Sequence, residues 1–396
     1  MTPIPRLRAY SGPALLSYGF RPFFFGATVY AGVGLLIWLP LFSGDLAVPT
    51  TFSPVDWHIH EMLYGYLPAV ITGFLLTAIP NWTGRLPLQG GPLAILFAAW
   101  IAGRIAISIS GVIGPLAAGV IDASFLLLIV AAAAREVIAG RNWRNLPPVF
   151  LVLVFFTGNV TFHVEDAMTG TAQIGARIGI AAAIALVSLI GGRVVPSFTR
   201  NWLARENPGR LPVPFGRFDT ATLGVAVITL AVWIVLPDWQ GTAALMLLAG
   251  ILQTVRLARW AGDRTTRDRL VLVLHVGYAF VPLGFFILAA AILFPDAVPV
   301  SAGIHAWTVG AIGVMTLAIM TRASLGHTGQ ALKADILTQA IYGAVAIAAF
   351  LRITAAFAVQ ASMPLLHAAG AAWIAAFWMF AIGYGPSLWR SRKTNR

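Results

Sequence analysis

Histidine and acidic side chains gather in one short segment of this sequence, Trp57-His58-Ile59-His60-Glu61-Met62. On a regular helix His58 and Glu61 share a face, whereas His60 points to the opposite side and shares a face with Tyr64. Imidazole and carboxylate groups can bind a transition metal, and a carboxylate can also carry protons. Both histidines can serve one metal only if the first turn is irregular. Otherwise they have two different tasks, or they form an interfacial cluster with Trp57.

A second polar group lies near the end of a later apolar run. Asn159 and His163 are four residues apart and share a helical face, so they could complete a metal site at the outer side of the membrane. The alternative for His163 is a solvated cap. Glu165 follows closely, and it joins Glu61 and Tyr64 as a candidate catalytic group, the two glutamates as proton relays.

Three other histidines suggest further sites. His305 is followed by small residues that would let a planar cofactor or another helix approach, so it is a candidate haem or metal ligand or a hydrogen-bonded core histidine. His275 and His327 lie toward the opposite membrane face, where they could mark a second centre, a proton entry path or neither. On one continuous helix His305 and His327 would be roughly 33 Å apart, too far to share a site.

Three arginines lie at membrane depth. Arg104 precedes a helical turn by about as many residues as Asp122 follows it, which predicts an ion pair across an antiparallel hairpin. Arg177 and Arg352 have no acidic neighbour in the sequence. They could bind haem propionates or form ion pairs with distant residues.

Composition sets the environment of these residues. Hydrophobic residues make up 59% of the 396 and charged residues only 10%, which is too little polar surface for a water-soluble globule. Lipid must therefore surround most of the chain. The sequence has no cysteine, which excludes disulfides, thiolate metal sites and iron–sulfur clusters and leaves nitrogen and oxygen ligands.

Apolar runs predict an all-α, polytopic transmembrane helical bundle of about 12 helices. We expect a cytoplasmic segment 1–22, a single transmembrane domain 23–388 and a basic cytoplasmic tail 389–396. The predicted spans are 23–41, 57–81, 92–111, 115–138, 145–166, 173–195, 218–237, 241–261, 268–294, 300–323, 335–357 and 363–388.

Charge gives an independent test of topology. With both termini cytoplasmic, all Lys and Arg residues except Arg104, Arg177 and Arg352 fall on the inner side. The net charge of +12 is therefore a topology signal that places basic loops against anionic lipid, and we expect no nucleic-acid partner. The expected location is the inner membrane of a bacterium.

Several segments resemble one known family. They are Gly19-Phe20-Arg21-Pro22-Phe23-Phe24, the segment 57–62, Gly191-Gly192-Arg193-Val194-Val195-Pro196, Leu274-His275-Val276-Gly277-Tyr278, and the stretch 305–329 with Met320-Thr321-Arg322 and Gly326-His327-Thr328-Gly329. In this order they resemble the NnrS proteins. The resemblance implies a multi-span bacterial membrane protein that contains haem and copper and is associated with denitrification and the response to nitric oxide.

The expected function is binding and reduction of nitric oxide by a haem-dependent oxidoreductase. Haem b, with copper or another second metal, would be the cofactor, and quinol or a cytochrome would donate electrons. His58, His60, His275 and His305, with Arg177 and Arg352, are the candidate cofactor-binding residues; His58, His60, His163, His305 and His327 are the candidate metal ligands. The alternatives are a transporter of a metal, haem or small anion, and a haem-based sensor of nitric oxide without turnover.

Overall fold

The computed structural model describes residues 10–391, and 82% of it is helical, with no strand among those residues. The predicted all-α fold is confirmed. In lipid, a spanning segment must satisfy its own backbone hydrogen bonds, and these apolar runs do so as helices. Parts of the predicted N-terminal segment and basic tail, residues 1–9 and 392–396, lie outside the described residues.

The helices follow one another with short connections. Their bounds are α1 Phe20–Ser43, α2 Pro54–His60, α3 Leu67–Thr83, α4 Gly91–Ser108, α5 Ser110–Ile113, α6 Pro115–Ala139, α7 Leu146–Thr169, α8 Gln173–Glu206, α9 Arg217–Val235, α10 Gln240–Ala258, α11 Arg269–Leu293, α12 Val300–His305, α13 Val314–Thr328, α14 Ile336–Phe357 and α15 Ser362–Trp389.

Twelve helical stretches in the described part of the chain are long and apolar enough to cross a membrane, as predicted. The predicted run 57–81 lies within Pro54–Thr83, and α5 and Gly114 form the short connection between the predicted spans 92–111 and 115–138. Gly114 has φ +90°, a left-handed conformation that favours glycine over residues with a side chain. The protein is therefore a multi-pass membrane protein.

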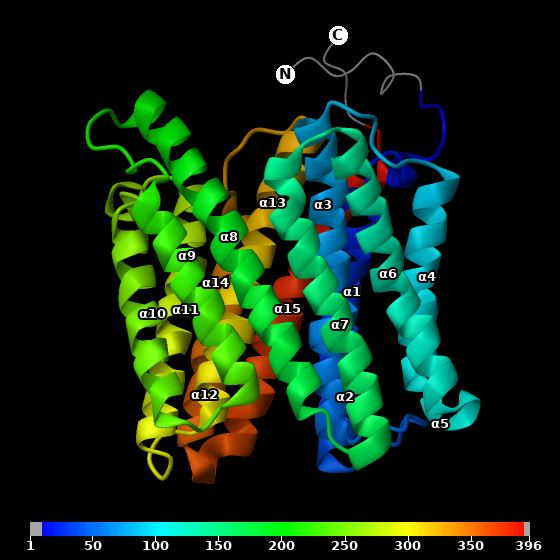
Figure 1. The fold of residues 1–396 in the computed structure, drawn as a ribbon. Coiled ribbons are helices and arrows are strands. Elements are labelled where there is room, and N and C mark those ends of the chain that lie inside the picture. Colours follow the sequence, from blue (N-terminus) through cyan, green and yellow to red (C-terminus); the bar gives the residue numbers. More distant parts are fainter. Residues whose placement is uncertain (1–9, 392–396) are drawn as a thin grey trace. The chain divides into compact units, whose positions relative to one another are not determined.

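The chain forms two compact units. Unit 1 contains the described residues up to Gly179, with Met320–Ala331 and Phe377 onward; unit 2 contains Ile180–Ile319 and Leu332–Ala376. In unit 1, α4 packs on α6, α6 packs on α3 and α7, and α3 packs on α1, so these helices run side by side (Figure 1). In unit 2, α11 packs on α10 and α12, and α10 also packs on α9.

Within unit 1, the start of the first span contacts the end of the last span. Arg21, near the start of α1, donates from Nη1 to the backbone oxygens of Leu388 and Arg390 at 2.8 and 2.7 Å. A helix leaves its last carbonyl groups without internal partners, and the guanidinium satisfies two of them here. The first and last spans therefore have these ends on the same side of the membrane.

Two of the spans are interrupted by π-helical segments. Glu61–Tyr66 lies between α2 and α3, and Ala306–Gly313 lies between α12 and α13. A π-helix has a wider turn than an α-helix and is common at functional sites. In each span a histidine, His60 or His305, is the last residue before the wide turn.

Candidate functional site

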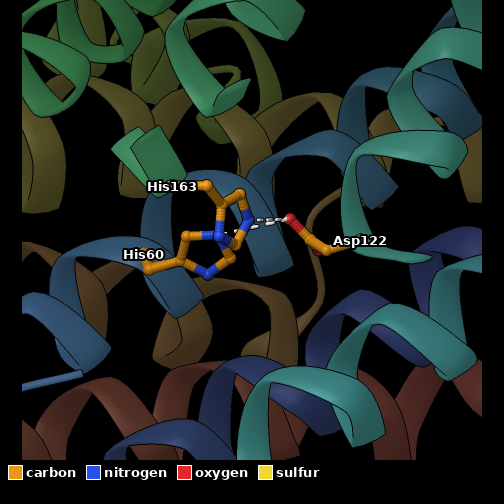
Figure 2. Close-up of side chains that lie close together, drawn as sticks. All are labelled: His60, Asp122 and His163. Atoms are coloured by element: carbon orange, nitrogen blue, oxygen red, sulfur yellow. Dashed lines mark hydrogen bonds and ion pairs between the residues drawn. The ribbon is translucent and has the colours of Figure 1, made fainter. Parts of the chain in front are cut away.

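A group of buried polar side chains, which we name the His–Asp cluster, lies within the helices of unit 1. Residues at the junction of α2 with the π-helical segment face residues from α4, α6 and α7, and Figure 2 shows three of them together. The cluster consists of His60, Glu61, Arg104, Asp122, Asn159 and His163. Polar groups in such an apolar setting must satisfy one another.

Asp122 is the centre of the cluster. Its Oδ2 accepts a hydrogen bond from Asn159 Nδ2 over 2.8 Å, and it lies 3.1 Å from His163 Nε2 and 3.2 Å from His60 Nε2. Its Oδ1 accepts from Arg104 Nη2. The predicted Arg104–Asp122 pair is therefore present, and Asn159 and His163 share a face as predicted.

Oxygen atoms face both ring nitrogens of His60. Nδ1 lies 2.8 Å from Glu61 Oε1, and Nε2 lies 3.1 Å from Asn159 Oδ1 in addition to its approach to Asp122. A neutral imidazole has only one N–H, so it can donate on one side only. The lone pair of the other nitrogen then faces the lone pair of an oxygen, and the two repel each other. A proton or a bound cation between them removes this repulsion.

Glu61 and Arg104 extend the cluster toward α4. Arg104 Nη1 donates to Glu61 Oε1, the same oxygen that faces His60. Glu61 Oε2 and Arg104 Nε are buried and have no hydrogen-bond partner among the described residues. Glu61 is fully buried at 0% exposure, so water cannot reach its second oxygen from the surface. This oxygen can take up a proton or accept a hydrogen bond only from a group inside the protein.

Glycines provide the space for these side chains. A Cβ on Gly65 would overlap Arg104 Nη1, and one on Gly119 would lie 3.2 Å from His163 Cγ. A Cβ on Gly103 would lie 3.0 Å from Asp122 Oδ1. The polar side chains thus pack directly on the backbone of neighbouring helices.

Three members of the cluster can form a metal site. His60, Asp122 and His163 each offer one ligand atom, and these atoms all lie within 4.8 Å of one another. Two imidazole nitrogens and one carboxylate oxygen suit copper, zinc or iron. Glu61 would be the hydrogen-bonding partner that orients a ligating His60 through Nδ1.

His58 takes a different direction from His60. Its ring stacks on Trp38 of α1 with a centroid distance of 4.0 Å. Of the five histidines predicted as metal ligands, the described cluster brings together His60 and His163. The two histidines of the 57–62 segment therefore have different surroundings, one of the alternatives left open by their spacing.

The other two predicted catalytic groups differ in their relation to the cluster. Tyr64 packs beside His60, with ring centroids 5.6 Å apart, and donates from its hydroxyl to Gly175 O over 2.7 Å. Glu165 accepts backbone hydrogen bonds from Ile174 and Gly175 at the start of α8. Its described hydrogen bonds therefore cap a helix and do not reach the cluster.

The described contacts of the remaining predicted ligand histidines are with residues outside the His–Asp cluster. His305 Nδ1 donates to Ser301 O over 2.7 Å, which gives Nε2 the lone pair needed by a ligand. His275 is buried in unit 2, with Nε2 2.8 Å from Thr199 Oγ1. In unit 1, the ring of His327 packs against Tyr18 and Phe20.

The arginines predicted to bind propionates lie in different units. Arg177 is half-buried in α8 within unit 1, and Arg352 is half-buried in α14 within unit 2. Their role toward haem stays a prediction.

The sequence analysis paired Arg104 with Asp122 but did not place either of them among the site residues. Their charge at membrane depth could have identified them, because inserting a charged residue into the membrane costs free energy and such residues tend to be functional. Gly103 beside Arg104 and Gly119 near Asp122 also indicate close approach.

The family model described as NnrS protein matches residues 14–392, essentially the whole chain. The chain belongs to the NnrS family. No curated protein matches the sequence. NnrS proteins are linked to the response to nitric oxide, and every residue of the His–Asp cluster lies within the matched region.

Proposed function

We propose that this NnrS protein binds nitric oxide at a membrane-embedded metal centre and reduces it to nitrous oxide in the bacterial inner membrane. The observation that carries the proposal is the His–Asp cluster. It combines two imidazoles, a carboxylate suited to metal binding and a second carboxylate suited to proton transfer, all within the membrane-spanning helices.

The residues fit the metals that the family implies. His60, His163 and Asp122 would hold copper, because their nitrogen and oxygen donors match its preferences without a thiolate. His305 is the candidate haem ligand, because its Nδ1–H bond to Ser301 fixes the ring and leaves Nε2 basic. Arg352, which belongs to the same unit as His305, would donate to a propionate.

The reaction joins two molecules of nitric oxide with two electrons and two protons to give nitrous oxide and water. When bound, the metals would supply the binding site for nitric oxide and pass the electrons, which come from quinol or a cytochrome. The Glu61 carboxylate, directly beside His60, would carry protons to the site. Arg104 donates to the Glu61 carboxylate and holds it in place, and the Tyr64 ring packs beside His60.

The test begins with protein purified in detergent. Metal analysis, optical spectra of the oxidised and reduced forms, and nitric-oxide uptake at an electrode are compared for the wild type, His60→Ala and His305→Ala. We expect His60→Ala to lose copper and His305→Ala to lose a haem Soret band, with loss of uptake in both. A protein that binds neither metal would contradict the proposal and favour transport. A metal-loaded protein that binds nitric oxide without consuming it would favour sensing.

A further inference from the structure

We propose that the start of α9 and the end of α10 bind the phosphate group of an anionic phospholipid, and that Arg217 and Arg259 hold it. The site belongs to unit 2 and does not depend on the proposed function. Arg217 is the first residue of α9, and Arg259 directly follows α10. Both belong to stretches that are long and apolar enough to cross a membrane, so these ends lie near the membrane surface, where lipid phosphates are found.

Phe218 connects the two arginines. The guanidinium carbon of Arg259 lies 4.7 Å from the centre of the Phe218 ring, and Arg217 precedes Phe218 in the chain. Stacking on an aromatic ring fixes the position of a guanidinium without using its N–H groups. These groups stay available for the paired hydrogen bonds that a phosphate accepts.

The acidic residues at this end of unit 2 have other partners. They are Glu206 with Arg205, Asp219 with Arg256, Asp263 with Arg210, Asp268 with the backbone N–H of Leu270, and Asp335 with Thr338. Within the described part of the chain, no ion pair or side-chain hydrogen bond involves Arg217 or Arg259. Their two positive charges are therefore available to a ligand.

The loop before α9 presents apolar side chains next to these arginines. Val213 is 44% and Phe215 is 55% exposed. The loop is held in place, because the Val213 N–H donates to the Arg259 carbonyl over 3.0 Å. Arg264 Nη2 also donates to the Asn207 carbonyl over 3.0 Å. Exposed apolar side chains beside basic ones suit the boundary between lipid headgroups and acyl chains, which favours a phospholipid over free phosphate.

Charge favours an anionic lipid over a zwitterionic one. The headgroup of a zwitterionic lipid carries its own cation, which competes with arginine for the phosphate. An anionic lipid such as phosphatidylglycerol brings a net negative charge to the two arginines. The distribution of basic residues predicts that this end of unit 2 faces the cytoplasm, where the membrane surface is negatively charged.

The experiment titrates the full-length protein in detergent with phosphatidylglycerol or phosphatidylcholine and measures bound lipid by native mass spectrometry. The test variant combines Arg217→Gln with Arg259→Gln. The control combines Arg205→Gln with Arg210→Gln, which removes the same charge from two exposed, ion-paired arginines of the same unit. We expect the test variant to bind phosphatidylglycerol on the order of 25-fold more weakly, at about fivefold for each arginine. The control and the binding of phosphatidylcholine should stay near wild type.

Two further measurements identify the ligand as a lipid. Phe215→Ser should weaken the binding of phosphatidylglycerol without any change of charge, and inorganic phosphate should not compete with the lipid. Equal losses in the two double variants would indicate general attraction to a basic surface and would overturn the site. Competition by inorganic phosphate, with no loss in Phe215→Ser, would overturn the assignment to a lipid.

The single variant Arg217→Gln keeps the proposal testable if the double variant does not fold. Arg217 is exposed and has no described side-chain contact, so its replacement should leave the fold intact. It should lower the affinity for phosphatidylglycerol about fivefold. Wild-type affinity in this variant would show that Arg217 does not hold the phosphate.

Discussion

Asn159 holds Asp122 in position by donating from Nδ2 to Oδ2 over 2.8 Å, while its own Oδ1 faces His60. The amide therefore presents a donor to the carboxylate and an acceptor to the imidazole. Partners of this kind orient metal ligands, and their loss typically lowers metal affinity about 10- to 100-fold.

Replacing Asn159 by leucine should lower copper affinity by about 10- to 100-fold while the helices stay folded, because Asp122 and His60 lose a common partner. The measurement is copper affinity by competition with a chromophoric chelator. Thr157→Ala is the matched control, since Thr157 is exposed on the same helix and bonds only within it. Equal affinities in the two variants would show that Asn159 does not orient the site.

Glu61→Gln should reduce nitric-oxide uptake at least about tenfold, a typical contribution of a positioned proton donor. Glu165→Gln should leave uptake close to wild type and mainly loosen the start of α8, because its carboxylate bonds to backbone N–H groups there. Uptake at equal metal content is the measurement. A larger loss in Glu165→Gln would reverse the roles assigned to the two glutamates.

Gly65→Ala should destabilise the protein by about 1–3 kcal/mol, because the new methyl group would overlap Arg104 Nη1, which ion pairs hold in place. Gly343→Ala is the control. Gly343 lies within α14, and a Cβ there meets no atom within 4 Å, so alanine should be neutral or slightly stabilising. Thermal unfolding in detergent compares the two, and similar midpoints would argue against tight packing of Arg104 on Gly65.

Arg256→Met should destabilise unit 2 by about 3–5 kcal/mol, because it leaves Asp219 buried without its cation. Arg256 is fully buried, and it donates to Asp219 Oδ1 over 3.0 Å and to the Tyr278 hydroxyl over 3.0 Å. Adding Asp219→Leu should restore part of the lost stability. A double variant that loses the sum of the two single effects would show that the ion pair is not the cause.

Asp335 gives a prediction outside the membrane-spanning segments. The pKa of this carboxyl is lowered because it accepts hydrogen bonds from the Thr338 hydroxyl and backbone N–H at the start of α14. A lowered pKa in the folded state means that the stabilisation is present above the unfolded-state pKa and is lost as the pH falls through the folded-state pKa.

Asp335→Ala should therefore lower stability by about 1 kcal/mol at neutral pH, and the difference from wild type should shrink as the pH enters the acidic range. Asp335→Asn keeps an acceptor without the charge and should show a smaller and less pH-dependent effect. Unfolding midpoints across pH provide the measurement. A difference that grows on acidification would contradict the assigned sign.

Local spacing predicted part of the site. The Arg104–Asp122 pair followed from equal depth in a hairpin, and the shared face of Asn159 and His163 followed from their four-residue separation. The meeting of these two pairs with His60 could not be derived, because it depends on how α2, α6 and α7 pack. The same limit applies to Arg256, Asp219 and Tyr278, which come from three different helices.

Hydropathy predicted the twelve spans well, because lipid requires long apolar segments whatever their partners are. It did not predict the π-helical segments. The residue types in 61–66 and 306–313 give no signal for a wider turn, because that turn depends on backbone hydrogen bonding within the packed unit.

The π-helical segment Glu61–Tyr66 makes the position of His60 depend on chain length as well as on residue type. A π turn accommodates about one residue more than an α turn, so removing Met62 would let α2 run into α3 as one regular helix. His60 would then rotate about the axis by roughly 100° relative to α3. A single-residue deletion could thus turn the imidazole away from Asp122 while every cluster side chain is retained.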